Sequence, residues 1–211
     1  MPLVIPEAVA AMIAGVVVHR TGHYTELIGA GMGLFTLGTG LYIHLNATSP
    51  LGEVFAYEVI AGIGAGFVFE PPLIALQAFV KQDDVATATA TFGFIRNLST
   101  SISLVLGGVV LQNSMNQRQS DLRAAGLPQN LLDQFTGRTS VANVDKIGRI
   151  ADARQQMAAE AAFAWSMRNM WILYVCVCFA GFLAAGFVSR AVLGKTHVET
   201  KTGIKERSET A

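Results

Sequence analysis

The chain has 211 residues, of which 52% are hydrophobic and only 14% are charged, and its mean hydropathy is +0.44. A soluble domain normally carries about 25% charged residues, so the composition indicates a membrane protein. The formal net charge is zero, and no basic cluster is interleaved with aromatic residues, which argues against a nucleic-acid partner.

Five apolar runs predict an all-α integral membrane protein with five transmembrane helices. A helix needs about 20 mostly apolar residues to cross a hydrocarbon core of about 30 Å. The predicted spans cover residues 3–18, 26–45, 55–80, 85–111 and 170–192. The first is short for a complete crossing. In the second, Gly29, Gly33 and Gly40 share a helix face, which predicts that a neighbouring helix approaches closely there.

Basic residues in the connections predict the orientation of the chain. Arg20 lies in the first short loop and Lys81 in the third, whereas the second loop, residues 46–52, has no lysine or arginine. The positive-inside rule then places loops one and three and the C-terminal tail, residues 194–211, in the cytoplasm. Met1 and the long segment 114–168 lie outside.

The segment 114–168 is predicted to be an outer helical loop. Its sequence SDLRAAGLPQNLLDQF predicts two short helices separated by a break between Gly126 and Pro128. Residues 147–168 predict an amphipathic helix that leads into the last span. We interpret the whole segment as a cap at the membrane surface.

Two charged residues stand inside the third and fourth predicted spans. Glu70 lies thirteen residues before Asp83, where the chain turns, and Arg96 lies thirteen residues after it. Two antiparallel helices joined at this turn place both charges at one depth, about 15 Å from the membrane surface. Each charge also lies on a stripe of small and polar residues: Gly62, Gly66, Glu70 and Gln77 in one span, and Thr89, Gly93, Arg96, Thr100, Ser103 and Gly107 in the other.

These charges are predicted to face protein or a water-filled cavity. A charged side chain that faces lipid at the midplane costs at least about 3 kcal/mol. Pro71 and Pro72 follow Glu70 directly, and they remove the donors that would bond the carbonyl groups of Phe67 and Val68. A broken helix with ionisable groups at mid-depth is typical of a transport path.

Two interpretations of Glu70 and Arg96 stay open at this point. They could act directly on a substrate or a proton, or they could form a static ion pair that locks two helices together. Glu58, nearer the outer end of its span, is interpreted as an interfacial residue.

Other patterns do not predict a cofactor, a metal or an enzyme. GIGAG at 62–66 lies inside a membrane run, without the strand that a dinucleotide fingerprint requires. His19 and His23 have no third ligand nearby. Cys176 and Cys178, two residues apart on a predicted helix, point away from each other. No nucleophile and base are arranged as a catalytic site, and no cofactor is expected.

Four stretches resemble the C-terminal part of a major facilitator superfamily transporter, and are most similar to the fourteen-helix drug:proton antiporter group found in fungi. GVVVHRTGHY at 15–24 resembles the family's loop signature, although His19 stands where that signature has an acidic residue. AGIGAGFVFEPPLIALQ at 61–77 resembles the twelfth helix, and DVATATATFGFIRNLSTSISLVLGGVV at 84–110 resembles the thirteenth. The segment 114–168 sits where such proteins have an extended outer loop.

The resemblance implies that residues 1–193 are helices ten to fourteen of a longer transporter. The helices that carry the antiporter signature and the usual proton-coupling acidic residues would then be absent, so the chain is expected to be a fragment. Many members of the group have glutamine where this chain has Glu70, which argues against a proton role shared by the family.

Two functions are compared. The first is a part of a secondary transporter that exports small, largely apolar or amphipathic compounds, with protons as possible counter-ions, in a plasma membrane rather than a vacuole. It would need the missing N-terminal half, or another helix bundle, as a partner and be inactive alone. The residues predicted to line its cavity are Glu70, Gln77, Arg96, Asn97, Phe67 and Phe92, with Phe69 as further aromatic surface. The alternative is a non-transporting membrane scaffold or regulatory protein.

Overall fold

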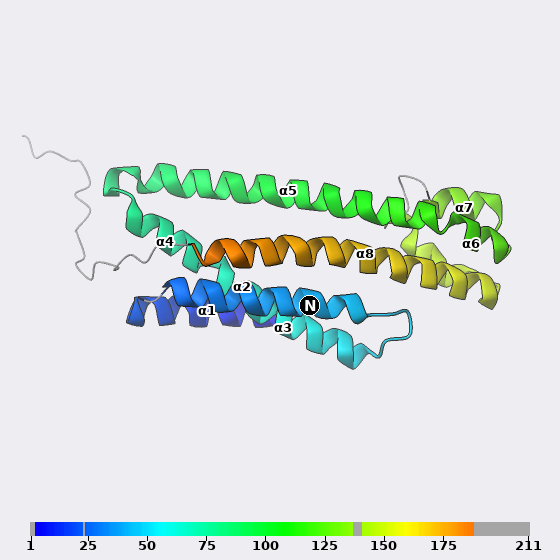
Figure 1. Ribbon diagram of the computed structural model, residues 1–211, viewed down its shortest axis with the longest axis horizontal. Coiled ribbons are helices and arrows are strands. Elements are labelled where there is room, and N and C mark those ends of the chain that lie inside the picture. Colours follow the sequence, from blue (N-terminus) through cyan, green and yellow to red (C-terminus); the bar gives the residue numbers. More distant parts are fainter. Residues whose placement is uncertain (1–2, 23, 137–140, 188–211) are drawn as a thin grey trace, which may run out of the picture.

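A computed structural model describes residues 3–22, 24–136 and 141–187 of the chain, and every regular element in this part is a helix. The long helices run along one axis, as Figure 1 shows. Their bounds are α1 Val4–Thr21, α2 Tyr24–Leu41 with the short helix η1 Tyr42–His44, α3 Leu51–Phe69, α4 Pro71–Phe79, η2 Gln82–Asp84, α5 Val85–Gln117, α6 Gln119–Ala124, α7 Gln129–Thr136, η3 Val141–Arg149 and α8 Ala153–Ala185.

The chain is an all-α membrane protein, and its described residues contain five helices long and apolar enough to cross a bilayer. Each of the five predicted spans overlaps one of these helices, and α5 and α8 extend furthest beyond the predicted bounds. α5 continues to Gln117, and α8 begins at Ala153, seventeen residues before the predicted start of the last span. The predicted tail, residues 194–211, lies outside the described residues, as do His23 and the end of the last predicted span.

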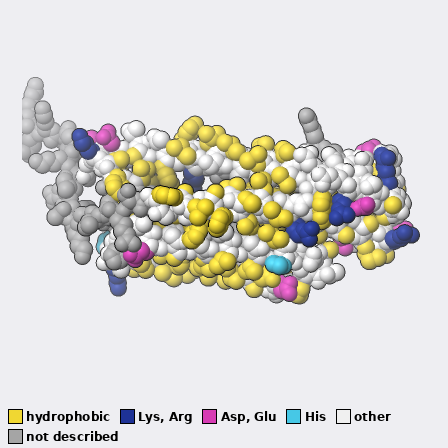
Figure 2. Space-filling model, in the orientation of Figure 1, with side chains coloured by type: hydrophobic (Ala, Val, Ile, Leu, Met, Phe, Trp, Pro, Cys, Tyr) yellow, Lys and Arg dark blue, Asp and Glu magenta, His cyan; other side chains and the backbone are white. Residues whose placement is uncertain are grey.

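The molecule has two different ends (Figure 1). One end, called the turn end here, holds the α1–α2 connection, the α4–α5 turn and the end of α8. The other, called the cap end, holds the α2–α3 connection together with α6, α7 and η3. Between the ends the surface in Figure 2 is dominated by hydrophobic side chains, whereas charged side chains gather toward the ends. This distribution fits a bilayer around the middle of the molecule.

Glycines allow α1, α2 and α3 to pack closely. In α2 the closest of these contacts are made by glycines outside the face that the sequence predicted. A Cβ atom at Gly38 would lie 2.6 Å from the backbone of Ala61, and one at Gly31 would lie 2.7 Å from the Cβ atom of Phe67. Gly29 and Gly40 have open space beside them, and Gly33 faces the ring of Phe182 in α8. The predicted face of α2 is thus approached by α8 at Gly33, where a Cβ atom would lie 3.3 Å from the Phe182 ring, while the tighter contacts with α3 lie on the opposite side of the helix.

The described residues of the segment 114–168, which are 114–136 and 141–168, form a folded unit of several helices. The two short helices predicted in SDLRAAGLPQNLLDQF are α6 and α7, and the residues that follow form η3 and the first half of α8. One cluster of buried side chains joins all of these to α5: Leu111, Met115, Leu122, Leu127, Leu132, Phe135, Ile147, Ala159 and Ala162. We call α6, α7, η3 and the parts of α5 and α8 packed on them the cap. It has a hydrophobic core of its own.

The cap explains the length of α5 and α8. Each has 33 residues, which corresponds to about 50 Å at 1.5 Å per residue. A hydrocarbon core is about 30 Å thick, so a substantial part of each helix lies beyond it. The charged residues of α8, Arg154, Glu160 and Arg168, all fall in its first sixteen residues, which places the extension at the cap end.

Candidate transport site at the helix break

The third span is interrupted at Glu70. α3 ends at Phe69 and α4 begins at Pro71, with Glu70 between them at φ −91° and ψ −42°. The first backbone hydrogen bonds of α4 run from the N–H groups of Leu73 and Ile74 to the carbonyl of Glu70. Pro71 and Pro72 have no N–H to donate, so the last turn of α3 and the first turn of α4 are not joined by the usual helical bonds.

Arg96 of α5 lies against this break. Its guanidinium carbon is 3.5 Å from the centroid of the Phe69 ring, the last residue of α3. A guanidinium over an aromatic face is attracted by the negative face of the ring, and more strongly where water is excluded. The contact puts Arg96 at the level of Glu70, in agreement with the depth argument from the sequence.

A second polar contact joins α4 to α5 between the break and the turn. The side chain of Gln77 donates a hydrogen bond from Nε2 to Oγ1 of Thr89, at 3.1 Å. Thr89 and Arg96 belong to the same polar stripe of α5. Together the two contacts turn this stripe toward the broken helix.

The cap-end part of the same stripe faces α8. The hydroxyl of Tyr174 donates to the carbonyl of Ser103 at 3.1 Å, and its ring lies beside Gly107. Between these contacts the stripe is open, because Arg96, Asn97 and Thr100 are exposed. The other side of α5 carries exposed apolar side chains, among them Phe94, Ile95, Leu98 and Ile102. α5 therefore has a polar face and, on its other side, an apolar face of the kind that contacts lipid.

Not all the predicted site residues meet at this place. Phe67 packs toward Gly31 of α2 rather than toward α5. Glu70 and Phe92 are half-buried, and Asn97 is exposed. Among the described residues no ion pair joins Glu70 to Arg96, whose recorded contact is the ring of Phe69. The static ion pair considered from the sequence is thus not the arrangement found.

The predicted stripe of α3 also has a different role from the one expected. A Cβ atom at Gly62 would lie 2.6 Å from the carbonyl oxygen of Leu3, and one at Gly66 would lie 2.7 Å from the Cβ atom of Ala10. This part of the stripe therefore packs directly on α1. The polar face continues toward α5 only beyond the break.

Glu58, interpreted from its position as an interfacial residue, has surroundings that the sequence did not indicate. One of its carboxylate oxygens is buried and has no hydrogen-bond partner among the described residues. Its position twelve residues before Glu70 suggested an interfacial residue, because that spacing puts it near the helix end. The burial follows from the packing of α3 against its neighbours, which a single sequence does not reveal.

The described residues contain no group of three histidine, cysteine, aspartate or glutamate side chains that could hold a metal ion. The arrangement at the break offers instead a fixed cation, an aromatic face, amide and hydroxyl groups and a half-buried carboxylate. Such a set can hold and orient a small molecule without bond-making chemistry. The fold and this site define a multi-pass membrane protein whose third span is interrupted beside polar side chains.

Proteins similar to the chain are fungal transporters. It is 35% identical to the MFS-type transporter ppz2 of Metarhizium majus and 36% identical to the efflux pump dotC of Dothistroma septosporum, in each case over 97% of this chain and 35% of the relative. An MFS-type transporter of Aspergillus terreus is 30% identical over 97% of this chain and 37% of its own length. The resemblance to fungal transporters of the major facilitator superfamily is therefore confirmed over nearly the whole chain.

The chain spans about a third of the length of the curated relatives it matches. No protein-family profile and no solved structure matches it.

Proposed function

We propose that the chain is the C-terminal membrane region of a secondary transporter that exports small, largely apolar compounds. The names of its relatives support transport and efflux. The observation that carries the proposal is the stacking of Arg96 on Phe69 at the interruption of the third span. A cation that is always charged lies there beside free backbone carbonyl groups, at a depth where lipid would exclude both.

In this mechanism the break is the substrate side of the chain. The exposed polar face of α5, with Arg96 and Asn97, and the nearby Gln77 line one wall of a central cavity. Phe69 and Phe92 provide aromatic surface for apolar compounds. The remaining helices of a full transporter provide the opposite wall, and the two halves rock about the site in alternating access. Export is coupled to proton entry in this proposal. Because many members of the group have glutamine at the position of Glu70, a proton-accepting role of its half-buried carboxylate would be particular to this chain.

The turn end faces the cytoplasm and the cap end faces outward. Arg20 lies in the last turn of α1 and Lys81 in the α4–α5 turn, both at the turn end, whereas the α2–α3 connection at the cap end has neither lysine nor arginine; the positive-inside rule supports this orientation. The plasma membrane is the proposed location, since there the cap lies outside the cell and export removes the compound from it. The fourteen-helix arrangement predicted from the resemblance is part of the same proposal.

The test uses the chain as part of a complete transporter. It is expressed in place of the matching third of the efflux pump dotC, in a drug-sensitive yeast, and energy-dependent efflux of a fluorescent apolar compound is measured. Arg96→Ala is expected to abolish efflux at an unchanged protein level. Arg123→Ala, which removes an exposed arginine of the cap, is the matched control and is expected to have no effect.

Other outcomes separate the alternatives. Full efflux with Arg96→Ala would refute the role of Arg96, and a loss of the protein itself would assign it to folding. The 211 residues alone are expected to move no substrate in liposomes with a pH gradient, because alternating access requires two sets of helices. If the dotC chimera were also inactive but stably inserted, the alternative function as a membrane scaffold would be favoured.

A further inference from the structure

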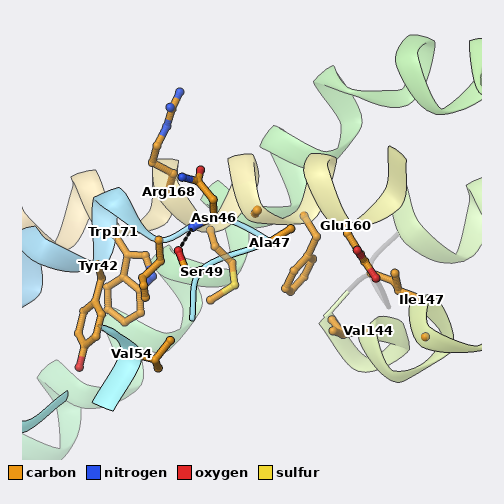
Figure 3. Close-up of a pocket in the computed structure, with 15 residues that line it drawn as sticks. Tyr42, Asn46, Ala47, Ser49, Val54, Val144, Ile147, Glu160, Arg168 and Trp171 are labelled. Carbon is orange, nitrogen blue, oxygen red and sulfur yellow. Dashed lines mark hydrogen bonds between the residues drawn. The ribbon is translucent and has the colours of Figure 1, made fainter. Parts of the chain in front are cut away.

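A cavity lies at the cap end, well away from the helix break. Its volume is about 410 Å³; it is open on one side and is lined by the α2–α3 connection, η3 and the cap-end half of α8. Figure 3 shows aromatic rings from η1 and α8 on one side and side chains of η3 on the other. Most of the lining is apolar: Tyr42, Val54, Ile147, Phe163, Met167 and Trp171 contribute to it. The size falls in the range of small-molecule sites, about 300–1,000 Å³.

The aromatic wall is held in place by its own contacts. The rings of Tyr42 and Trp171 have centroids 4.5 Å apart at an interplanar angle of 35°, and Trp171 meets Tyr174 edge-on at 5.8 Å. Tyr174 is in turn tied to the carbonyl of Ser103. Because each ring is fixed by the next, the wall needs little ordering when a ligand binds, which favours binding.

The rim formed by the α2–α3 connection is also a defined structure. The backbone N–H of Asn46 donates to Oγ of Ser49 at 3.0 Å, and the N–H of Ser49 donates to the carbonyl of Asn46 at 3.1 Å. The first of these bonds is drawn in Figure 3. Both residues line the cavity.

One carboxylate gives the cavity its charge preference. Glu160 extends from α8 toward η3 in Figure 3 and accepts a hydrogen bond from Gln156 at 2.8 Å on one of its oxygens. No ion pair to Glu160 is recorded in the described part of the chain. Arg168 also belongs to the lining, but its guanidinium extends away from the other lining side chains in Figure 3. Lys146 of η3 donates to Oε1 of Gln134 at 2.7 Å. The charge that remains in an aromatic cavity is therefore negative.

We propose that this cavity is a second binding site, which takes amphipathic organic cations. Aromatic faces attract a cation, Glu160 supplies the opposite charge, and the apolar lining takes the rest of the molecule. The site is built from the cap and the cap ends of the spans and shares no residue with the break. This proposal does not depend on whether the chain takes part in transport.

The two tryptophans of the chain allow a direct test. Trp165→Phe leaves Trp171, in the cavity wall, as the only tryptophan, while Trp171→Phe leaves only Trp165, which stacks with Arg118. The purified full chain in detergent micelles is titrated with tetraphenylphosphonium and with tetraphenylborate, which have the same shape and opposite charge. Tetraphenylphosphonium is expected to change Trp171 emission in a saturable way, at lower concentration than tetraphenylborate.

Glu160→Gln in the Trp171-only protein is expected to weaken tetraphenylphosphonium binding about tenfold and to remove the preference over tetraphenylborate. Asp133→Asn removes the same charge from α7, outside the cavity, and is the control. It is expected to leave the tetraphenylphosphonium affinity and the preference over tetraphenylborate unchanged. Three results would overturn the proposal: no saturable signal from Trp171, an equal signal from the Trp165-only protein, or binding that Glu160→Gln leaves intact.

Discussion

The contact between α2 and α3 predicts opposite effects for two glycines that are two residues apart. A Cβ atom at Gly38 would lie 2.6 Å from Cα and N of Ala61 and 2.9 Å from its Cβ atom, whereas one at Gly40 would meet nothing within 4 Å. Ordinary contact needs about 3.4 Å or more, so Gly38→Ala forces α2 and α3 apart by roughly 1 Å. A gap of that size forfeits a quarter to a half of the dispersion energy of the atoms around it.

Gly38→Ala is therefore expected to lower the free energy of unfolding by about 1–3 kcal/mol, as overpacked cores do. Gly40→Ala is expected to be neutral or to stabilise by up to about 1 kcal/mol, because alanine is the better helix former. The measurement is reversible unfolding of the purified chain in mixed micelles with increasing dodecyl sulfate, followed by helicity. If the two variants unfolded at the same dodecyl sulfate fraction, the close approach of α2 and α3 would be refuted.

Two further predictions concern the cap. Phe135→Ala removes a ring that is 1% exposed in the core of the cap, and it is expected to lower the stability of the cap by about 3–5 kcal/mol. Hydrogen exchange should then accelerate in α6 and α7 but not in α3. Equal acceleration in α3 and in these two cap helices would show that the cap is not a separate folding unit. Asn169→Leu removes the bond from Nδ2 to Oγ of Ser114, 3.1 Å long, and is expected to cost about 1 kcal/mol, seen as a lower midpoint of thermal unfolding. A midpoint at or above that of the unchanged chain would show that this bond does not hold α5 to α8.

The sequence predicted the spans better than their packing. Hydropathy over about 20 residues is a strong signal, so each of the five runs is found as a helix. Whether a helix stops at the membrane surface depends on what covers it beyond. α5 and α8 continue because the cap buries Met115 and Ala159, and those contacts join segments far apart in the chain. The glycine face of α2 was predicted in part for the same reason. Spacing gives the faces of a helix, but it did not indicate that α8 would lie at Gly33 and that α3 would pack on the opposite face, at Gly31 and Gly38.

The candidate site was predicted in part. Counting residues from the turn put Arg96 level with the break, because an antiparallel helix pair fixes depth by arithmetic. The residue that Arg96 contacts could not be predicted by counting. Glu70 and Phe69 are adjacent in the chain, and which of the two side chains points toward Arg96 depends on how the chain turns at Pro71. The placement of Phe67 against α2 has the same origin.

The length of α5 has a mechanical consequence. The helix is held to α8 near its cap end by Asn169 and near its middle by Tyr174, which bonds Ser103, and toward its other end it contacts Phe69 and Gln77 on either side of the break. The part of α5 from Ser103 to Val85 is thus an arm of roughly 27 Å. A tilt of about 10° about Ser103 would carry the turn end by roughly 5 Å for an arm of this length, and α4 would travel with it while the chain bends at Glu70. A molecule that stiffens the cap would therefore restrain the opposite side of the membrane.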